Sequence, residues 1–300
     1  MPTFPVIQHD DASADRPPFE RIAIVGLGLM GGSLALAIRR RWRGGLIIGV
    51  DRKDALEAGM RMHAVDVGAD DLGMAAEADL IVLAAPVRQN IAVLKRLPEF
   101  VAGRVLVTDI GSTKREILRE ARTLPDRLTF VGGHPLAGAA ATGISWAVPH
   151  LFDTRPWLLA TPAPEEALSR LEALVRGVGS IPVRMDADRH DTLLAFLSHL
   201  PQLTASALMH VVGERAGAEG LTLAGRGLRD TTRLALSSPE IWRDITATNA
   251  ADIEEALDLL IAALEQLRAD LRSGDDLLRI FESAARWKRL LEGSAGEPGI

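Results

Sequence analysis

Three glycines and an aspartate near the start of the sequence have the types and spacing of a phosphate-binding turn. Gly26, Gly28 and Gly31 match G-x-G-x-x-G after a short apolar run, and Asp51 ends the next run, about twenty residues further on. The first glycine permits a sharp bend, the second lets the backbone approach a pyrophosphate, and the third lets a helix pack against a strand. The helix end offers N–H groups to phosphates, and the aspartate can bind ribose hydroxyls, so we expect a dinucleotide site.

The identity of the dinucleotide depends on the residues around Asp51. A carboxylate at this position accepts both ribose hydroxyls of NAD and repels a 2′-phosphate, which favours NAD. Arg52 and Lys53 follow directly and could attract that phosphate, so NADP remains an alternative. Three further residues, which flank the glycine turn or close the third apolar run, are expected to contact the cofactor: Leu29, Met30 and Pro86.

A histidine and a serine are placed to act on a hydroxyl group. His134 follows an apolar run and precedes Pro135, which biases its neighbour toward extended backbone. A neutral imidazole can take a hydroxyl proton while a hydride leaves the same carbon. Ser112, in a Gly-Ser turn after another run, could bind a ligand, cap the helix expected from Thr113, or do both. From the residues alone, His134 could instead only cap a loop.

Two arginines suit a ligand with two carboxylates. Arg229 and Arg233 are four residues apart and would share one helix face. Guanidinium groups match carboxylates with two parallel hydrogen bonds. The alternative is a solvated face, which the apolar residues that follow make less favourable. His190, Asp191 and His199 lack the carboxylates of a convincing metal set, so we expect core or capping roles for them and no metal site.

The surrounding pattern predicts strands that alternate with helices. Short apolar runs are typical of buried parallel strands. They are RIAIVG, GLIIGVD, ADLIVLAAP, GRVLVTDIGS and LTFVGGHP, with RPWLLATP and IPVRM as further strands. Helical patterns fill the gaps, so we predict an α/β fold with a Rossmann-type doubly wound parallel sheet. Ligands bind at the carboxyl ends of such strands, which is where the glycine turn and Ser112 lie.

Beyond residue 186 only helices are predicted. The expected segments are Ala187–Gly213, Ala218–Leu236, Pro239–Arg272 and Asp275–Glu292. The third has apolar residues at three- and four-residue spacing, which makes one face apolar. A symmetric partner chain would cover such a face, so a homodimer is favoured over a self-contained helical core. The chain then divides into a flexible leader at 1–18, a dinucleotide-binding domain at 19–185, and an all-α substrate and dimerisation domain at 186–300.

Bulk composition limits the kinds of partner. The 300 residues carry a formal net charge of -6, which argues against nucleic acid. The chain contains no cysteine, so disulfides and thiolate metal sites are excluded. The polar, proline-rich start lacks a secretory signal, and the most apolar stretch, Leu193–Val212, contains two histidines, a proline and a glutamine that disfavour a bilayer span. We expect a soluble, cytoplasmic protein with no membrane partner.

Four segments together resemble the prephenate/arogenate dehydrogenase family. They are GLGLMGGSLA, TDIGSTK, GGHPLAG, and LRDTTRLALSSPEIWRDI, the last supported by SHLPQ. They occur in the family's order and span nearly all of the chain except the leader. The third and fourth are specific, whereas the first is shared with many oxidoreductases. The resemblance implies NAD-dependent oxidative decarboxylation of prephenate or arogenate, which yields 4-hydroxyphenylpyruvate or tyrosine.

The resemblance also implies roles for individual residues. His134 matches the family's base, and Ser112 matches a serine that hydrogen-bonds the substrate hydroxyl and that base. A set of residues in the helical half matches positions that bind or surround the substrate: Arg233, Arg229, Gln202, Trp242 and His199.

Two departures from the family pattern leave the choice between prephenate and arogenate open. The family often has Thr-Glu where this chain has Ala139 and Ala140, and often has His where this chain has Gln202. Two other functions stay as alternatives. A β-hydroxyacid dehydrogenase shares the first motif, but it would place a catalytic lysine in the helical half, where only Lys288 occurs. A non-catalytic NAD-binding sensor is the other.

Overall fold

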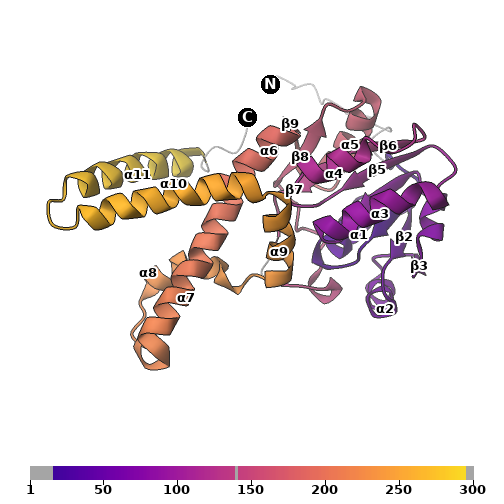
Figure 1. Cartoon of the computed structure of the whole chain (residues 1–300). Helices are drawn as coiled ribbons and strands as arrows, with labels where there is room; N and C mark the ends of the chain where they lie inside the picture. Colours follow the sequence, from indigo (N-terminus) through magenta and orange to yellow (C-terminus); the bar gives the residue numbers. More distant parts are fainter. Residues whose placement is uncertain (1–15, 139–140, 295–300) are drawn as a thin grey trace, which may run out of the picture. The chain divides into compact units, whose positions relative to one another are not determined.

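The computed structural model describes residues 16–138 and 141–294, and its first part is a parallel α/β fold (Figure 1). Six strands form one parallel sheet in the order β3-β2-β1-β4-β5-β6. These strands are β1 (Arg21–Val25), β2 (Leu46–Val50), β3 (Val67–Ala69), β4 (Leu80–Leu83), β5 (Val105–Asp109) and β6 (Leu128–Val131). The helices of this part are α1 (Leu29–Arg41), α2 (Lys53–Arg61), α3 (Val87–Phe100), α4 (Arg115–Ala121) and α5 (Glu165–Gly177). The predicted Rossmann-type sheet is confirmed.

The sheet has a hydrophobic core on each face. Ile22 and Ile24 of β1 join a core that includes residues of α1 and α5. Ala23 and Val25, the alternate residues of the same strand, join a second core with residues of α3 and α4. Because successive side chains of a strand point to opposite faces, a strand covered on both sides must be apolar throughout. This requirement explains the continuous apolar runs in the sequence.

The run at residues 128–135 forms two strands, not the single strand predicted. β6 ends at Val131, and β7 (Gly133–Pro135) joins β8 (Pro156–Thr161) and β9 (Ile181–Asp186) in a second, three-stranded sheet. β7 is antiparallel to β8, which is parallel to β9. The turn brings the backbone close to β5, since a β-carbon at Gly133 would lie 2.6 Å from the carbonyl oxygen of Asp109. The small sheet therefore carries His134 past the carboxyl end of β5.

The helices after β9 differ from those predicted: the first helical stretch runs on to Leu221, and the second and third are broken. They are α6 (Ala187–Leu194), α7 (Leu200–Leu221), α8 (Arg226–Thr231) and α9 (Pro239–Thr248), with a π-helical turn at 195–199 and a 3-10 turn at 233–236. The single helix expected over 218–236 is wrong. α7 ends at Leu221, and Thr232 (φ -100, ψ 10) separates α8 from the 3-10 turn. The hydroxyls of Thr231 and Thr232 donate to backbone carbonyls one turn earlier, which competes with helix continuation.

The long helix expected over 239–272 is also interrupted. Asn249 (φ -138, ψ 33) separates α9 from α10 (Ala250–Ala269). Its amide nitrogen donates to the carbonyl oxygen of Asp191 at 2.8 Å, and its amide oxygen accepts from Arg115 at 3.4 Å. The break thus ties the end of α9 to α6 and α4.

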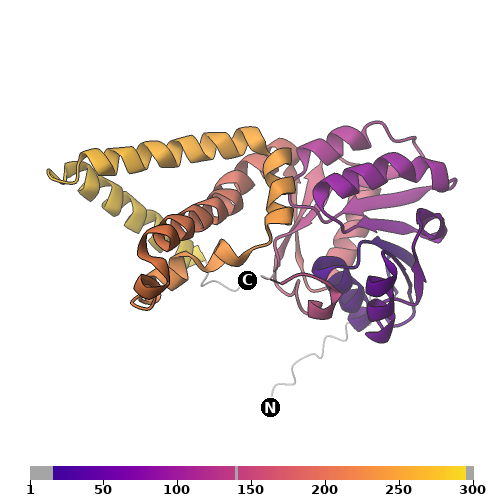
Figure 2. The same cartoon turned by 60° about the horizontal axis from the view of Figure 1, so that its bottom comes forward.

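Residues from Ala251 onward form a second compact unit, a hairpin of α10 and α11 (Asp275–Ser294), visible in Figure 2. Asp270 closes the turn, because its Oδ2 accepts the backbone N–H of Leu277 at 3.0 Å. Large apolar side chains on both helices are more than half exposed in the single chain: Leu259, Ile261, Leu264, Leu278, Phe281, Trp287, Leu290 and Leu291.

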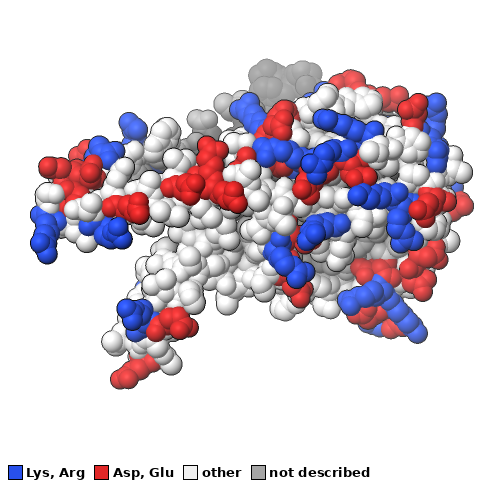
Figure 3. Space-filling view, viewed as in Figure 1, with Lys and Arg blue, Asp and Glu red and all other residues white. Residues whose placement is uncertain are grey.

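Further predictions concern the leader, a membrane span and the surface charge. The leader at 1–18, apart from residues 16–18, lies outside the described residues, as do Ala139 and Ala140. One helical stretch, Ala187–Leu221, is long and apolar enough to cross a membrane, judged by length and composition alone. This is weak evidence for a membrane span, because core helices of soluble proteins share those properties. On the face in Figure 3, basic and acidic side chains are interspersed.

Candidate active site

The glycine turn leaves open space at the start of α1. Gly26 has φ +102, and a β-carbon there would lie 2.7 Å from the backbone nitrogen of Ala85, so only glycine fits. A β-carbon at Gly28 would meet no described atom within 4 Å. Gly28 is the N-cap of α1 and makes no side-chain cap, so N–H groups of the first turn remain available to a ligand. Leu29 is buried at this end, and Met30 packs partly against the core.

Asp51 lies at the tip of β2, beside the glycine turn. Its Oδ2 accepts the backbone N–H of Leu27 at 2.5 Å, and its Oδ1 accepts that of Arg52 at 2.6 Å. These bonds fix the carboxylate where a ribose next to the turn would meet it. Arg52 and Lys53 are both exposed.

Pro86 and Asn90 shape the neighbouring turn between β4 and α3. Pro86 is exposed and forms the N-cap of α3. Asn90 is fully buried, and its amide accepts from the N–H of Ala85 at 3.0 Å and donates to the carbonyl of Leu83 at 3.2 Å. Asn90 is not among the residues predicted from the sequence. A buried amide one turn into a helix that follows a strand was the available signal.

His134 is held on β7 next to a second histidine. The side chain is only partly exposed, and its Nδ1 lies 2.9 Å from Nε2 of His190. The pKa of His134 is well below its ordinary value, mainly because burial disfavours the charged ring, and the neighbouring His190, Lys114 and His199 act in the same direction. His134 is therefore a neutral imidazole near neutral pH, which is the form a general base requires.

A buried ion pair ties the loop after β5 to β7. Lys114 Nζ lies 2.5 Å from Oδ2 of Asp109, and both side chains are fully buried. The Asp109 carboxylate also accepts the backbone N–H of Gly111 at 2.9 Å and of Gly133 at 3.1 Å. Those two N–H groups belong to the residues just before Ser112 and His134. The Asp109 carboxylate thus fixes the backbone next to both predicted catalytic residues.

Ser112 does not cap α4. The N-cap of that helix is Lys114, and the backbone N–H groups of Lys114 and Arg115 are accepted by the carboxylate of Asp191, each at 2.8 Å. Among the described residues no hydrogen-bond partner is seen for the partly exposed Ser112 hydroxyl. The hydroxyl is thus left for a ligand, and the capping prediction applies to Asp191 instead.

His199 and Gln202 make side-chain contacts with the segments that follow α7. His199 is fully buried, and the ring of Trp242 meets it edge-on with 5.8 Å between centroids. Gln202 donates from Nε2 to the carbonyl of Leu234 at 2.7 Å and accepts from Ser237 Oγ at 2.9 Å. Both ends of the Gln202 amide are engaged within the chain, so this residue fixes the 3-10 turn.

Arg229 and Arg233 do not share a helix face, because α8 ends between them. Both side chains are exposed, and neither makes an ion pair or hydrogen bond with any described residue. Arg233 opens the 3-10 turn that Gln202 holds. Two guanidinium groups with no ion pair among the described residues can still bind an anion, although the shared-face geometry predicted for them is wrong.

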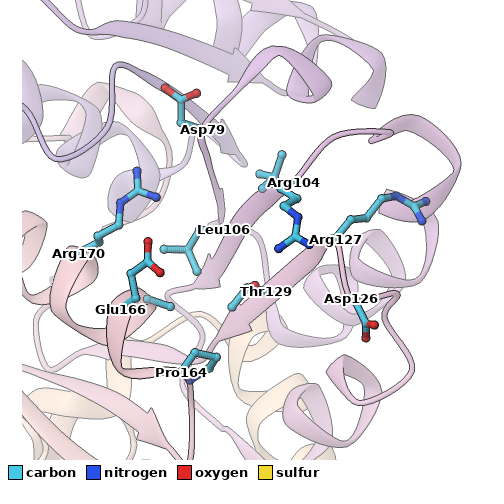
Figure 4. A pocket seen from close by; sticks show the side chains of 11 residues that line it. Asp79, Arg104, Leu106, Asp126, Arg127, Thr129, Pro164, Glu166 and Arg170 are labelled. Atoms are coloured by element: carbon cyan, nitrogen blue, oxygen red, sulfur yellow. The ribbon is translucent and has the colours of Figure 1, made fainter.

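A separate hollow of about 320 Å³ lies at the opposite edge of the sheet, near the amino ends of β5 and β6 (Figure 4). Arginines and acids of several elements line it, among them Arg104, Arg127, Asp126 and Glu166. It contains none of the predicted site residues. Within residues 16–138 and 141–294, no group of three or more His, Asp or Glu could hold a metal ion.

Comparison with protein families finds two matches. The family model described as the prephenate dehydrogenase nucleotide-binding domain matches residues 34–184, and the one described as the prephenate dehydrogenase dimerization domain matches residues 186–283. The prephenate dehydrogenase of Bacillus subtilis is 34% identical over 280 residues, which are 90% of this chain and 75% of that protein. The cyclohexadienyl dehydrogenase of Zymomonas mobilis is 31% identical and covers 91% of this chain and 97% of its own.

Solved structures show the same similarity. Prephenate dehydrogenase from Aquifex aeolicus, in complex with hydroxyphenyl propionate and NAD+, aligns with a TM-score of 0.82 and 28% identity over 90% of this chain and 97% of its own. Arogenate dehydrogenase from Synechocystis aligns with a TM-score of 0.71 and 31% identity over 92% and 98%. A 3-hydroxyisobutyrate dehydrogenase from Salmonella typhimurium, at 0.57 and 17%, shares the fold alone.

Proposed function

Because this chain belongs to the prephenate dehydrogenase family, we propose that it oxidises and decarboxylates prephenate, arogenate or both in tyrosine biosynthesis, with NAD+ as hydride acceptor. The observation that carries this proposal is the placement of His134 on β7, hydrogen-bonded to His190, while one carboxylate, Asp109, holds the backbone next to both His134 and Ser112. An oxidation of a carbinol needs a base of this kind next to the hydride acceptor.

The residues of the glycine turn fit NAD+. The open space at Gly28 and the uncapped start of α1 suit a pyrophosphate, and the fixed carboxylate of Asp51 suits the ribose hydroxyls. NAD+ bound there supplies the hydride acceptor. The exposed side chains of Arg52 and Lys53 leave some attraction for a 2′-phosphate, so NADP is the second candidate.

His134 and Ser112 act on the substrate hydroxyl. Nε2 of His134 takes the hydroxyl proton as the hydride leaves C4 of the ring, and the Ser112 hydroxyl holds the same oxygen. The ring carboxylate leaves as CO₂, and its bonding electron pair enters the ring. Aromatisation then makes the step irreversible. These residues contribute orientation and proton removal, which are the usual protein contributions in a reaction of this class.

Arg233 and Arg229 bind the carboxylates of the substrate. Prephenate carries one carboxylate on the ring and one on the pyruvyl side chain, and each of the two exposed guanidinium groups can bind one of them. Gln202 supports this contact indirectly, because its amide is engaged with Leu234 and Ser237. Trp242, whose ring meets that of His199 edge-on, is expected to contribute an apolar surface to the substrate site.

The α10–α11 hairpin supports a homodimer. Its exposed apolar side chains are typical of an interaction surface, and the matching family model is described as a dimerization domain. We assign the helical part, residues 186–300, to substrate binding and self-association, and residues 19–185 to the dinucleotide. We also propose a cytoplasmic location for the chain, in line with its prephenate dehydrogenase relatives.

A paired assay tests the proposed function. NADH formation is followed by absorbance with prephenate and with arogenate, each with NAD+ and with NADP+. We expect turnover with NAD+ and at least one of the two dienols. If the enzyme oxidises a β-hydroxyacid and neither dienol, it is a β-hydroxyacid dehydrogenase and the proposal is wrong. NAD+ binding by calorimetry without any turnover would instead indicate a sensor.

A further inference from the structure

His134 is the first member of a hydrogen-bonded series of three side chains. Nε2 of His190 lies 2.9 Å from Nδ1 of His134, and Nδ1 of His190 lies 2.7 Å from Oδ1 of Asp191. His190 and Asp191 are both fully buried. They come from the middle of α6, far from β7 in sequence, so the series exists only in the folded chain.

The direction of each hydrogen bond follows from the charge of Asp191. Burial acts to raise the pKa of this carboxyl, but hydrogen bonds from His190 and from the backbone N–H groups of Arg115 and Lys114 bring it below its ordinary value. Asp191 is therefore an anion and can only accept. The hydrogen between Asp191 and His190 must then stand on Nδ1 of His190.

The next hydrogen is fixed in the same way. Burial keeps the pKa of His190 below its ordinary value despite the hydrogen bond to Asp191, so the ring is neutral and its Nε2 has a free lone pair. That lone pair accepts the Nδ1–H of His134. Since His134 is also neutral, its remaining nitrogen, Nε2, carries a lone pair and no hydrogen. The tautomer with the hydrogen on Nε2 would direct the lone pair of His134 at His190 and leave no base for a substrate.

We propose that His190 and Asp191 are positioning residues that hold His134 in the Nδ1–H tautomer and stabilise the imidazolium formed when Nε2 takes a proton. This inference rests on the proposed role of His134 as the base. The proton stays on His134 until product leaves, while the anion of Asp191, two hydrogen bonds away, offsets the new charge. Lys114 opposes that charge, and Asp109 offsets Lys114.

The test compares two substitutions of His190. His190→Gln keeps an acceptor that can reach Nδ1–H of His134, whereas His190→Leu removes it. We expect His190→Leu to lower kcat about hundredfold or more, with the Kd of NAD+ unchanged within about twofold, and His190→Gln to recover most of that loss. The matched control is His150→Leu, an exposed histidine outside this series, for which kcat should stay at the parent value.

A spectroscopic measurement gives a result independent of turnover. Nitrogen NMR of isotope-labelled histidine should show His134 of the parent protein protonated at Nδ1 and bare at Nε2, with that preference lost in His190→Leu. The inference is overturned if the parent shows the Nε2–H tautomer, or if His190→Leu keeps parental kcat. Parental activity in His134→Asn would instead show that His134 is not the base. The NMR measurement would still report which tautomer of His134 is present.

Discussion

A β-carbon at Gly31 would lie 1.9 Å from the carbonyl oxygen of Gly26, which no side chain can tolerate. The third glycine of the motif is therefore needed for the fold, because it lets α1 start directly behind the turn. Gly28 differs, since its β-carbon would enter open space and its backbone (φ -77, ψ -161) is accessible to any residue. The two positions separate the structural from the binding function of one motif.

Gly28→Ala should weaken NAD+ binding without loss of stability. The added methyl group would occupy space that a pyrophosphate needs, so we expect the Kd of NAD+ to rise about tenfold or more while Tm stays within a few degrees of the parent. Calorimetric titration and thermal melts measure the two effects. Gly103→Ala, which also meets no atom within 4 Å but lies away from the turn, is the matched control. Gly31→Ala should instead fail to fold or melt far lower.

His134→Asn should abolish most turnover while leaving the cofactor site intact. Asparagine keeps a polar side chain of similar reach but cannot take a proton near neutral pH. General bases contribute about 10²- to 10⁴-fold, so kcat should fall by that order, with the Kd of NAD+ unchanged. His63→Asn is the control, because His63 is exposed and its φ of 55 suits asparagine. Equal turnover in His134→Asn would refute the assignment of the base.

The pKa of His134 predicts the pH dependence of activity and stability. The base must be neutral, and its pKa lies well below 6.5, so kcat/KM should be flat near neutral pH and fall only in the acidic range. Unfolded histidine takes up a proton near 6.5, whereas folded His134 and His190 do so only at lower pH. The free energy of unfolding should therefore decrease as pH drops below 6.5. Melting curves of the parent and of His134→Asn, recorded across that range, measure this contribution. A fall in kcat/KM that begins above pH 6.5 would contradict the lowered pKa of His134.

The sequence predicts the sheet better than the helical half, for a physical reason. Apolar runs such as residues 80–83 are buried on both faces, and their short length, with Pro86 soon after, distinguishes them from helices. The helix breaks at Thr232 and Asn249 depend on hydroxyl and amide hydrogen bonds to distant or local backbone groups, which no periodicity records. The switch of residues 128–135 between two sheets likewise depends on the close approach of Gly133 to Asp109.

The site shows the same division. The glycine turn and Asp51 are local in sequence, so their relation could be predicted. The contact of His190 and Asp191 with His134 joins α6 to β7, and the chain offers no local pattern that reports it. The capping role predicted for this group of residues is found for Asp191, which binds the N-terminal N–H groups of α4. The hydrogen bond to the base depends on tertiary structure alone.

Phe281→Glu should separate a dimer into monomers. The side chain is 62% exposed in the single chain, within the segment that matches the dimerization domain model. A buried phenylalanine contributes about 1.5–3 kcal/mol, and a charge in its place would also have to be desolvated. Sedimentation analysis should show the parent as a dimer and Phe281→Glu as a monomer. Lys288→Gln, which removes only a surface ion pair with Glu292, should remain dimeric. A monomeric parent would contradict the assignment.

Arg233→Gln should raise the KM for the dienol far more than it changes the Kd of NAD+. The guanidinium is exposed and has no ion pair among the described residues, so its removal leaves the fold unchanged. A hydrogen bond to a charged group is worth about 1.5–3 kcal/mol, which corresponds to a KM increase of roughly tenfold to hundredfold. Arg226→Gln is the matched control, because Arg226 pairs with Asp230 at 3.3 Å on the exposed side of α8.

If Arg233 binds the ring carboxylate, the substitution should also slow decarboxylation and lower kcat. If it binds only the side-chain carboxylate, kcat should stay near the parent value while KM rises. A variant with parental KM and kcat would show that neither carboxylate reaches Arg233.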